Sequence, residues 1–237
     1  RIHITGLSAG GAMTASMLAC YPDLFASGAI IAGLPHGIAR NVPQAMEAMA
    51  GRASAEADML GDHVRAASDH QGPWPRVSVW QGDADHTVVA GNGDAVAGQW
   101  RSVHGLDGAP DVAERIGAHS RSAWTDAKGR ELIELYAISG MGHGVPLRPG
   151  TGDGEAGTAG AHMLDVGLDS TGRIAAFFGL TETEAAKAGG AKSKASTLRK
   201  ATAKVVPLPR KAEPRPEPET TGVQAVIEKA LRAAGLM

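Results

Sequence analysis

The chain has 237 residues, 43% of them hydrophobic, a size and composition typical of one globular domain with additional segments. Its formal net charge of −2 combines an acidic body with a basic tail, since residues 1–185 carry 12 Lys and Arg against 21 Asp and Glu, whereas residues 186–237 carry 11 against 4. No apolar run approaches the ~20 residues of a membrane span. The single cysteine, Cys20, excludes a disulfide within this segment and disfavours a cysteine-based metal site.

The first predicted element is an apolar strand that runs directly into a glycine-rich turn and then a helix. The turn reads Gly6-Leu7-Ser8-Ala9-Gly10, and the helix-forming residues 12–20 follow it. This order is typical of a nucleophile elbow, a turn so sharp that Gly6 and Gly10 are predicted to be needed for it. Ser8 would then be exposed at a helix N-terminus, where free N–H groups favour negative charge. In a chain with 32 glycines, an ordinary glycine turn is the alternative.

Strands and helices alternate after this turn. The predicted elements are a strand at 28–33, a helix at 44–70, a strand at 76–80, a helix at 92–103, a hairpin of strands at 122–125 and 131–138, and a helix at 171–178. Such alternation predicts an α/β fold with a mostly parallel sheet flanked by helices on both faces.

Candidate partners for a serine nucleophile follow two later strands. A serine hydroxyl needs a base to take its proton and an acid residue to orient that base. Asp83 and Asp85 follow the 76–80 strand, at the strand end where sites of open α/β sheets are built, and their spacing leaves both open as the acid. The other Asp would cap the loop through backbone N–H groups. His143, between two glycines after the 131–138 strand, is the candidate base, and the order Ser, Asp, His is that of the α/β-hydrolase triad.

Other histidines have no such placement. His86, His104, His119 and His162 are predicted to be ordinary polar residues, and His36 could at most line a pocket. The 35–75 segment is long enough to form a cleft wall. Its Met and Trp residues could contact an acyl group or simply belong to the core, as could Trp80.

The combined motifs resemble the polyhydroxybutyrate depolymerase family of secreted serine esterases, which also contains feruloyl and acetylxylan esterases. The segments that carry the resemblance are 6–13, 21–26, 32–35, 82–88, 140–143 and 169–180. The resemblance covers about residues 1–180, and the combination is far more specific than the elbow alone. It implies the C-terminal portion of an α/β-hydrolase fold, with the early strands missing from this sequence.

Carried over by position, the resemblance implies Ser8 as nucleophile, Asp85 as orienting acid and His143 as general base and then general acid. The N–H of Ala9 would be one oxyanion-hole donor, whereas the second donor would come from the missing early part. The segment alone is therefore expected to be poorly stable and weakly active. Gln81 departs from the family pattern, in which His commonly precedes the glycine. The resemblance implies no cofactor and no metal.

The expected function is hydrolysis of carboxylic esters through an acyl-enzyme. The resemblance points to short-chain polyhydroxyalkanoate polymer or oligomers as substrate and to an extracellular location. The triad itself gives the reaction class only, so feruloyl or acetylxylan esters of plant cell walls remain the first alternative and amide cleavage a weaker one.

Composition divides the chain near residue 184. Residues 1–184 are predicted to be the catalytic domain, 185–221 a flexible linker that is basic and then Pro-rich, and 222–237 an amphipathic helix. The basic run in 187–211 could contact a surface or a polymer granule, which makes a binding module the non-enzyme alternative. Because this run has no aromatic residues for base stacking, a solvated linker is favoured over a nucleic-acid site.

Overall fold

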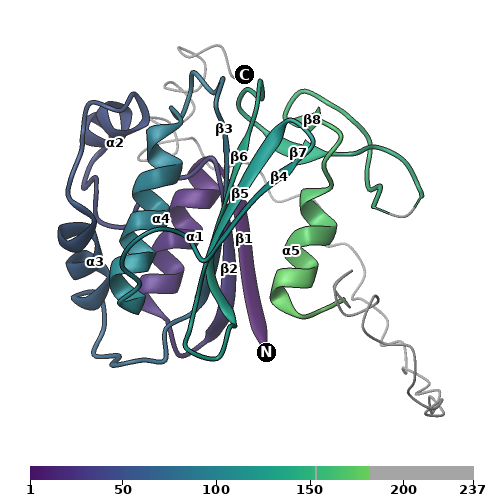
Figure 1. Ribbon diagram of the computed structural model, residues 1–237. Coiled ribbons are helices and arrows are strands. Elements are labelled where there is room, and N and C mark those ends of the chain that lie inside the picture. The colour runs from purple at the N-terminus through teal and green to yellow at the C-terminus, as the bar shows by residue number, and fades with distance from the viewer. Residues whose placement is uncertain (153, 182–237) are drawn as a thin grey trace, which may run out of the picture. The chain divides into compact units, whose positions relative to one another are not determined.

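Six strands form one mixed sheet in the order β1-β2-β3-β6-β5-β4 (Figure 1). The computed structural model describes residues 1–152 and 154–181, so the predicted linker and C-terminal helix lie outside the described residues. β1, β2, β3 and β6 run parallel, whereas β5 and β4 are antiparallel to their neighbours. The six strands are β1 (Ile2–Leu7), β2 (Phe25–Ile31), β3 (Arg76–Gly82), β4 (Val112–Ile116), β5 (His119–Thr125) and β6 (Glu131–Ile138).

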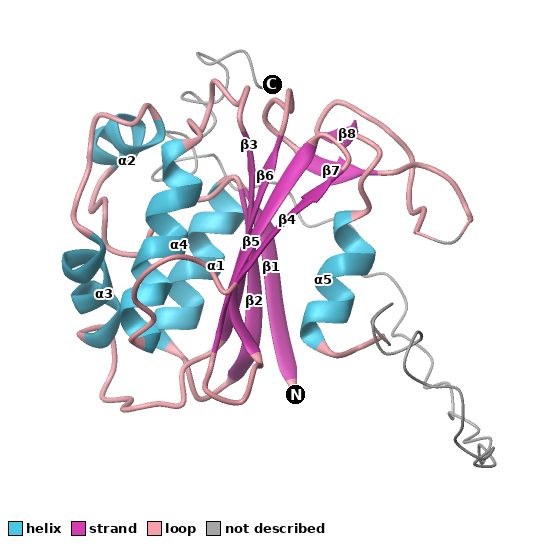
Figure 2. Cartoon of the chain, viewed as in Figure 1, coloured by secondary structure: helices cyan, strands magenta, loops and turns pink. Residues whose placement is uncertain are grey.

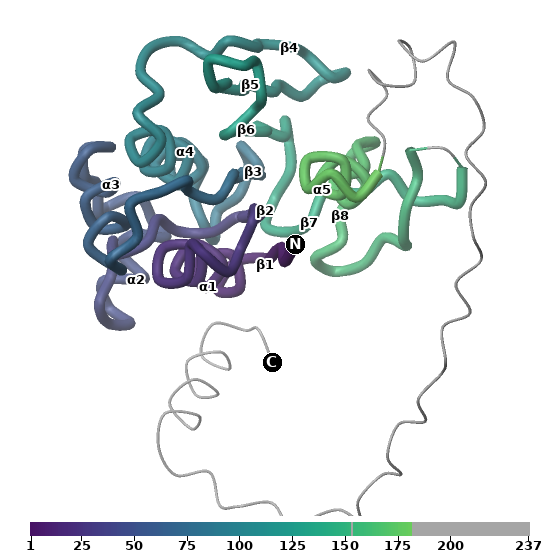
Figure 3. Tube along the Cα trace, turned by 90° about the horizontal axis from the view of Figure 1, so that it is seen from below, coloured from purple at the N-terminus to yellow at the C-terminus, as the bar shows by residue number. Residues whose placement is uncertain are grey.

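Helices cover both faces of this sheet (Figure 2). The helices are α1 (Ala9–Cys20), α2 (Val42–Met49), α3 (Ala57–Arg65), α4 (Gly91–His104) and α5 (Ser170–Phe178). α1 contacts β1 and β2 and α4 contacts β3 and β6, while α5 lies across the sheet from them, beside the short parallel pair β7 (Val145–Leu147) and β8 (Met163–Asp165) (Figure 3). The predicted α/β fold with flanking helices is confirmed.

β2, β3 and β6 are mostly buried on both faces, as strands inside a sheet covered by helices are, whereas the edge strand β1 is only partly buried. Ile30 and Val79 point toward α1 and α4 and join Leu18 and Trp100 in one core cluster. Their sequence neighbours on the strands, Ile31 and Trp80, point the opposite way and pack with the phenylalanines of α5. Trp80 is fully buried and its ring stacks on that of Tyr136, so it belongs to the core rather than to a substrate cleft.

Two details of the sequence-based prediction are wrong. The single helix expected at 44–70 is two helices. α2 ends at Met49 with Ala50 as its C-cap, and the next residue, Gly51, has the left-handed φ of 71° typical of a helix end. The short strands β4, β7 and β8 were not expected. β4 has mostly exposed residues and β7 and β8 have three residues each, so none shows a clear alternation of apolar and polar residues.

None of the helices in the described part of the chain has the length and apolar character that crossing a bilayer requires. The division of the whole chain into catalytic domain, linker and terminal helix stays a prediction.

Candidate active site

The carboxyl ends of four parallel strands bring the candidate residues to one edge of the sheet. Leu7 of β1 pairs with Ile31 of β2, Ile31 pairs with Trp80 of β3, and Trp80 pairs with Tyr136 of β6. The loops that follow β1, β3 and β6 therefore leave the sheet on the same side. These three loops carry the serine, the two aspartates and the histidine predicted from the sequence.

Ser8 has a strained backbone. Its φ of 58° and ψ of −119° lie where a residue with a side chain is rarely found, and such strain clusters at functional sites. The Ser8 N–H donates to the Ile31 carbonyl at 2.9 Å, which anchors the turn to β2. The Ser8 side chain makes no capping hydrogen bond to α1, so its hydroxyl is not used to stabilise the helix.

Ala9 is the first residue of α1, directly after Ser8. The first hydrogen bond of the helix runs from the Ala12 N–H to the Ser8 carbonyl at 2.9 Å. The Ala9 N–H precedes that bond, so it is one of the donors that a helix leaves without an intrahelical partner. It can donate to an oxygen held beside Ser8.

The two glycines of the motif have different roles. A Cβ at Gly6 would overlap the carbonyl oxygen of Gly10 and lie 2.9 Å from Thr14 Oγ1, whereas a Cβ at Gly10 would meet no described atom within 4 Å. The expectation that Gly10 is needed for the turn is therefore wrong. The second crowded position is Gly11, where a Cβ would lie 2.9 Å from the Ile31 carbonyl oxygen.

We expect Gly6→Ala to lower the free energy of unfolding by about 1–3 kcal/mol, because the new methyl group must displace backbone. Gly10→Ala is expected to raise the free energy of unfolding by about 0.5–1 kcal/mol, since alanine loses less conformational entropy than glycine when a helix forms. Urea unfolding of the two variants beside the wild type measures both values. Equal destabilisation by the two substitutions would contradict this division of roles.

His143 contacts one of the two candidate acids. Its Nδ1 lies 2.8 Å from Oδ2 of Asp85, whose side chain is completely buried, and 15% of the His143 side chain is exposed. Oδ1 of Asp85 accepts from the N–H groups of Thr87 and Val88 at 2.8 and 2.9 Å. Because a carboxylate only accepts, the Nδ1–H of His143 is the donor, which leaves Nε2 as the nitrogen that can take a proton.

Asp83 has a different partner. Its Oδ1 accepts from the Gly140 N–H at 2.6 Å, so this carboxylate ties the loop after β3 to the loop that carries His143. The two loops also touch directly: the Ala84 N–H donates to the Met141 carbonyl at 3.1 Å. A Cβ at Gly82 would overlap that same carbonyl oxygen, so the close approach requires glycine. Asp83 thus has the loop-capping role that the sequence left open for either aspartate.

Three further residues, which the sequence did not predict as part of the site, contact His143, Asp85 or the loop that carries His143. His119 accepts from the Ser139 N–H at Nδ1, 3.1 Å, and its Nε2 lies 2.9 Å from the Val166 carbonyl oxygen, so it supports the start of the His143 loop. His162 Nδ1 lies 3.2 Å from the His143 carbonyl oxygen, and the two rings are 6.2 Å apart. Gln81 Nε2 lies 3.5 Å from Oδ2 of Asp85.

His86 directly follows Asp85 in the same loop and is exposed, whereas His104 and His36 have partners elsewhere. Nε2 of His104 contacts the Pro75 carbonyl oxygen and Nδ1 of His36 contacts Ser16 Oγ. Within residues 1–152 and 154–181, no group of three or more His, Cys, Asp or Glu side chains is placed to hold a metal ion.

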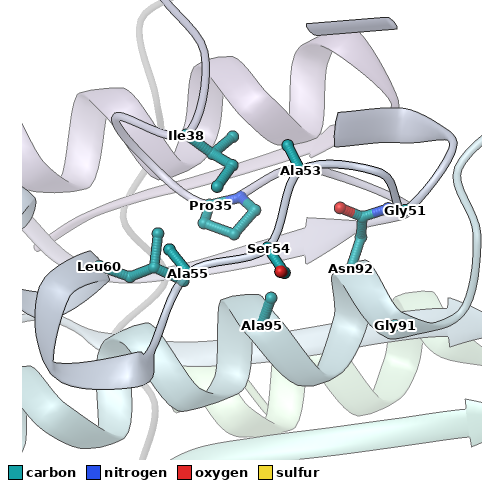
Figure 4. A pocket seen from close by; sticks show the side chains of 10 residues that line it. All are labelled: Pro35, Ile38, Gly51, Ala53, Ser54, Ala55, Leu60, Gly91, Asn92 and Ala95. Carbon is teal, nitrogen blue, oxygen red and sulfur yellow. The ribbon is translucent and has the colours of Figure 1, made fainter. Parts of the chain in front are cut away.

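A cavity of about 160 Å³ lies between the segment that joins α2 to α3 and the first turns of α4 (Figure 4). It is lined by Pro35, Ile38, Gly51, Ala53, Ser54, Ala55, Leu60, Gly91, Asn92 and Ala95. Neither His36 nor any of the three candidate catalytic residues lines it. Asn92 Nδ2 donates to the carbonyls of Ala48 and Met49 in α2 and to the carbonyl of Val89, at the end of the loop that carries Asp85.

Comparisons with known proteins show the family of the chain. Residues 1–122 match the family described as esterase PHB (polyhydroxybutyrate) depolymerase. Poly(3-hydroxyalkanoate) depolymerase C of Paucimonas lemoignei is 41% identical over 181 residues, which are 76% of this chain and 44% of that protein. Acetylxylan esterase of Coprinopsis cinerea is 34% identical over 151 residues, 62% of this chain and 40% of that protein. The chain thus spans less than half the length of these two relatives.

Solved structures show the same fold. Acetyl xylan esterase from Aspergillus awamori has a TM-score of 0.61 and 21% identity, covering 76% of this chain and 59% of that chain. PHB depolymerase from Penicillium funiculosum has a TM-score of 0.51 and 17% identity, covering 74% of this chain and 50% of that chain. At these identities the likeness concerns the fold alone.

Proposed function

The chain belongs to the PHB depolymerase family of esterases, and on this premise we propose that it is the catalytic part of a serine esterase. The observation that carries the proposal is the 2.8 Å contact between His143 Nδ1 and Asp85 Oδ2, at the sheet edge where Ser8 has a strained backbone. Ser8 is proposed as nucleophile, His143 as base and Asp85 as the acid residue that orients it.

In the proposed reaction, Ser8 Oγ attacks the carbonyl carbon of an ester while Nε2 of His143 takes the hydroxyl proton. The buried Asp85 stabilises the resulting imidazolium, and the Ala9 N–H donates to the oxyanion of the tetrahedral intermediate. Collapse of that intermediate breaks the bond to the alcohol, which leaves with the proton from His143. Water then attacks the acyl-enzyme, again with His143 as base, and the acid and free Ser8 are released.

The proposed substrates are short-chain polyhydroxyalkanoate polymers or oligomers, supported by the 41% identical depolymerase. Esters of plant cell walls are the second candidate, because acetylxylan and feruloyl esterases are also among the relatives. By the same likeness we propose an extracellular location. The basic tail, residues 186–237, stays the candidate for contact with a surface or granule, and deletion of that segment would show whether surface binding depends on it.

A covalent probe and three substrates test the proposal. An alkyl phosphonate ester is expected to stop hydrolysis of p-nitrophenyl butyrate and to be found on Ser8 by mass spectrometry. Hydroxybutyrate released from polymer or oligomers, compared with acetate and ferulate released from polysaccharide, then separates the two substrate classes. Hydrolysis that persists in fully labelled protein, or a label on another residue, would refute Ser8 as nucleophile.

A further inference from the structure

Gln81 is buried at the end of β3 with its amide directed at the Asp85 loop. Its Nε2 lies 2.8 Å from the Val88 carbonyl oxygen, 3.3 Å from the Gly82 carbonyl oxygen and 3.5 Å from Oδ2 of Asp85. All three are acceptors, so the amide nitrogen rather than the oxygen must face them. The direction of this side chain is therefore fixed by its partners.

The amide oxygen of Gln81, unlike its nitrogen, has no hydrogen-bond partner among the described residues. This atom, Oε1, is buried. A buried carbonyl oxygen without a donor costs free energy, and such groups in a folded protein call for a specific explanation. A role for the amide nitrogen beside the acid supplies one.

Val88 connects the amide to the acid by a second route. Its carbonyl accepts from Gln81 Nε2, and its N–H donates to Oδ1 of Asp85 at 2.9 Å. Val88 is therefore bound to Gln81 through its carbonyl and to Asp85 through its N–H. Gln81 therefore acts on both oxygens of the Asp85 carboxylate. It acts on Oδ1 indirectly, through Val88, and on Oδ2 directly, from 3.5 Å.

The surroundings leave Gln81 little room to move. A Cβ at Gly93, in the first turn of α4, would lie 2.7 Å from the Gln81 Cβ and 3.0 Å from its Cγ. The helix backbone therefore lies directly against the aliphatic part of the side chain. Only 3% of Gln81 is exposed, so solvent does not compete for its amide.

We propose that Gln81 is a positioning residue that acts through Asp85, keeping Oδ2 of the acid aimed at Nδ1 of His143; this inference rests on the proposed function. As a neutral donor, the amide constrains the carboxylate without adding charge to the acid and histidine pair. The residue touches no reacting atom. Its effect is on the geometry of the hydrogen bond that orients the base.

The first test is Gln81→Met, which keeps the length of the side chain and removes its donor. We expect kcat for p-nitrophenyl butyrate to fall about 10–100-fold, the range seen when the outer partners of metal-ligating residues are removed, with KM within about twofold. The downfield NMR signal of the His143 Nδ1–H should weaken or shift. Unchanged kcat in folded Gln81→Met overturns the proposal; if the wild type itself hydrolyses no ester, the proposed function fails and the NMR signal alone decides the role of Gln81.

Gln99 provides a matched control. It is also a fully buried glutamine whose Nε2 donates to two backbone carbonyls, those of His36 and Leu60, at 2.9 and 2.8 Å. Gln99→Met therefore removes the same kind of donor contact away from Asp85, together with the 2.8 Å hydrogen bond from the His36 N–H to Gln99 Oε1. It should lower the unfolding temperature but leave kcat and the His143 signal as in the wild type. An equal loss of kcat in both variants would mean that Gln81 is only structural.

Gln81→Glu covers the case in which the methionine variant fails to fold. Burial beside the Asp85 carboxylate disfavours ionisation of the new carboxyl, so at low pH its O–H can donate to Val88 as the amide does. Once ionised, the new carboxylate at position 81 repels the Asp85 carboxylate and can no longer donate a hydrogen bond to the Val88 carbonyl. The ratio of its kcat to that of the wild type should therefore fall about tenfold or more between about pH 6 and pH 9. A ratio that does not change with pH overturns the proposal.

Discussion

Asp85→Asn is expected to lower kcat for ester hydrolysis by about 10³–10⁴-fold in a protein that still folds. The N–H groups of Thr87 and Val88 both donate to Oδ1, so an asparagine must place its oxygen there and turn its amide nitrogen toward His143. Nδ1 of His143 would then accept, and Nε2 would carry the proton. A histidine in that tautomer cannot take the proton of Ser8. Steady-state kinetics with p-nitrophenyl butyrate measures the loss.

Asp83→Asn is the matched control for that variant. An asparagine oxygen can still accept from the Gly140 N–H, which is the only hydrogen bond of the Asp83 side chain within the described residues. We expect kcat close to that of the wild type. Loss of activity in Asp83→Asn with retention in Asp85→Asn would reverse the two roles.

The choice between these aspartates illustrates what sequence reasoning can reach. Both lie on one loop two residues apart, so their spacing predicts the strand end on which the acid lies but not which side chain faces the base. The Asp83 side chain is held instead by the Gly140 N–H, which comes from the turn after β6, 57 residues further along the chain. The resemblance to the family indicates Asp85, whose Oδ2 lies 2.8 Å from His143 Nδ1, and its role as the acid stays a prediction.

Local sequence predicted the elements better than it predicted their contacts. The strand, elbow and first helix follow from residues adjacent in the chain, and the structure has them as β1, Ser8 and α1. By contrast, the supports of the site come from distant residues: His119 holds Ser139 across neighbouring strands, and Gln81 meets Val88 where a loop folds back. No periodicity in the sequence carries that information.

A similar reason explains the error at Gly10. The motif shows that small residues surround Ser8, but which glycine is crowded depends on where other backbone lies. The Gly10 carbonyl presses against Gly6, and the end of β2 presses against Gly11, whereas Gly10 itself faces open space in the described structure. A turn motif therefore predicts a conformation more reliably than it predicts the cost of each substitution within it.

The largest effect on stability is expected at Arg121, which forms ion pairs with the buried Glu134 and with the more exposed Glu131 and Glu114. Glu134 of β6 is 2% exposed; its Oε2 accepts from Nε and Nη2 of Arg121 at 3.0 and 2.8 Å, and its Oε1 accepts from Ser78 Oγ. Arg121→Leu removes the charge partner and leaves the carboxylate buried. We expect the free energy of unfolding at pH 7 to fall by about 3–5 kcal/mol. Urea unfolding measures it, and Arg52→Leu, which breaks an exposed pair with Glu47, should be indistinguishable from the wild type.

The pH dependence of that loss identifies its cause. Burial raises the pKa of Glu134 in the folded protein even with Arg121 present, and removal of the arginine raises it further. A carboxyl whose pKa is higher in the folded state stabilises below the unfolded pKa and loses that contribution as pH rises through the folded one. The defect of Arg121→Leu should therefore be smaller near pH 4 than at pH 7. Adding Glu134→Leu should restore most of the stability at pH 7, because no unpaired charge is then buried; a double variant as unstable as Arg121→Leu would mean that lost packing, not the charge, causes the defect.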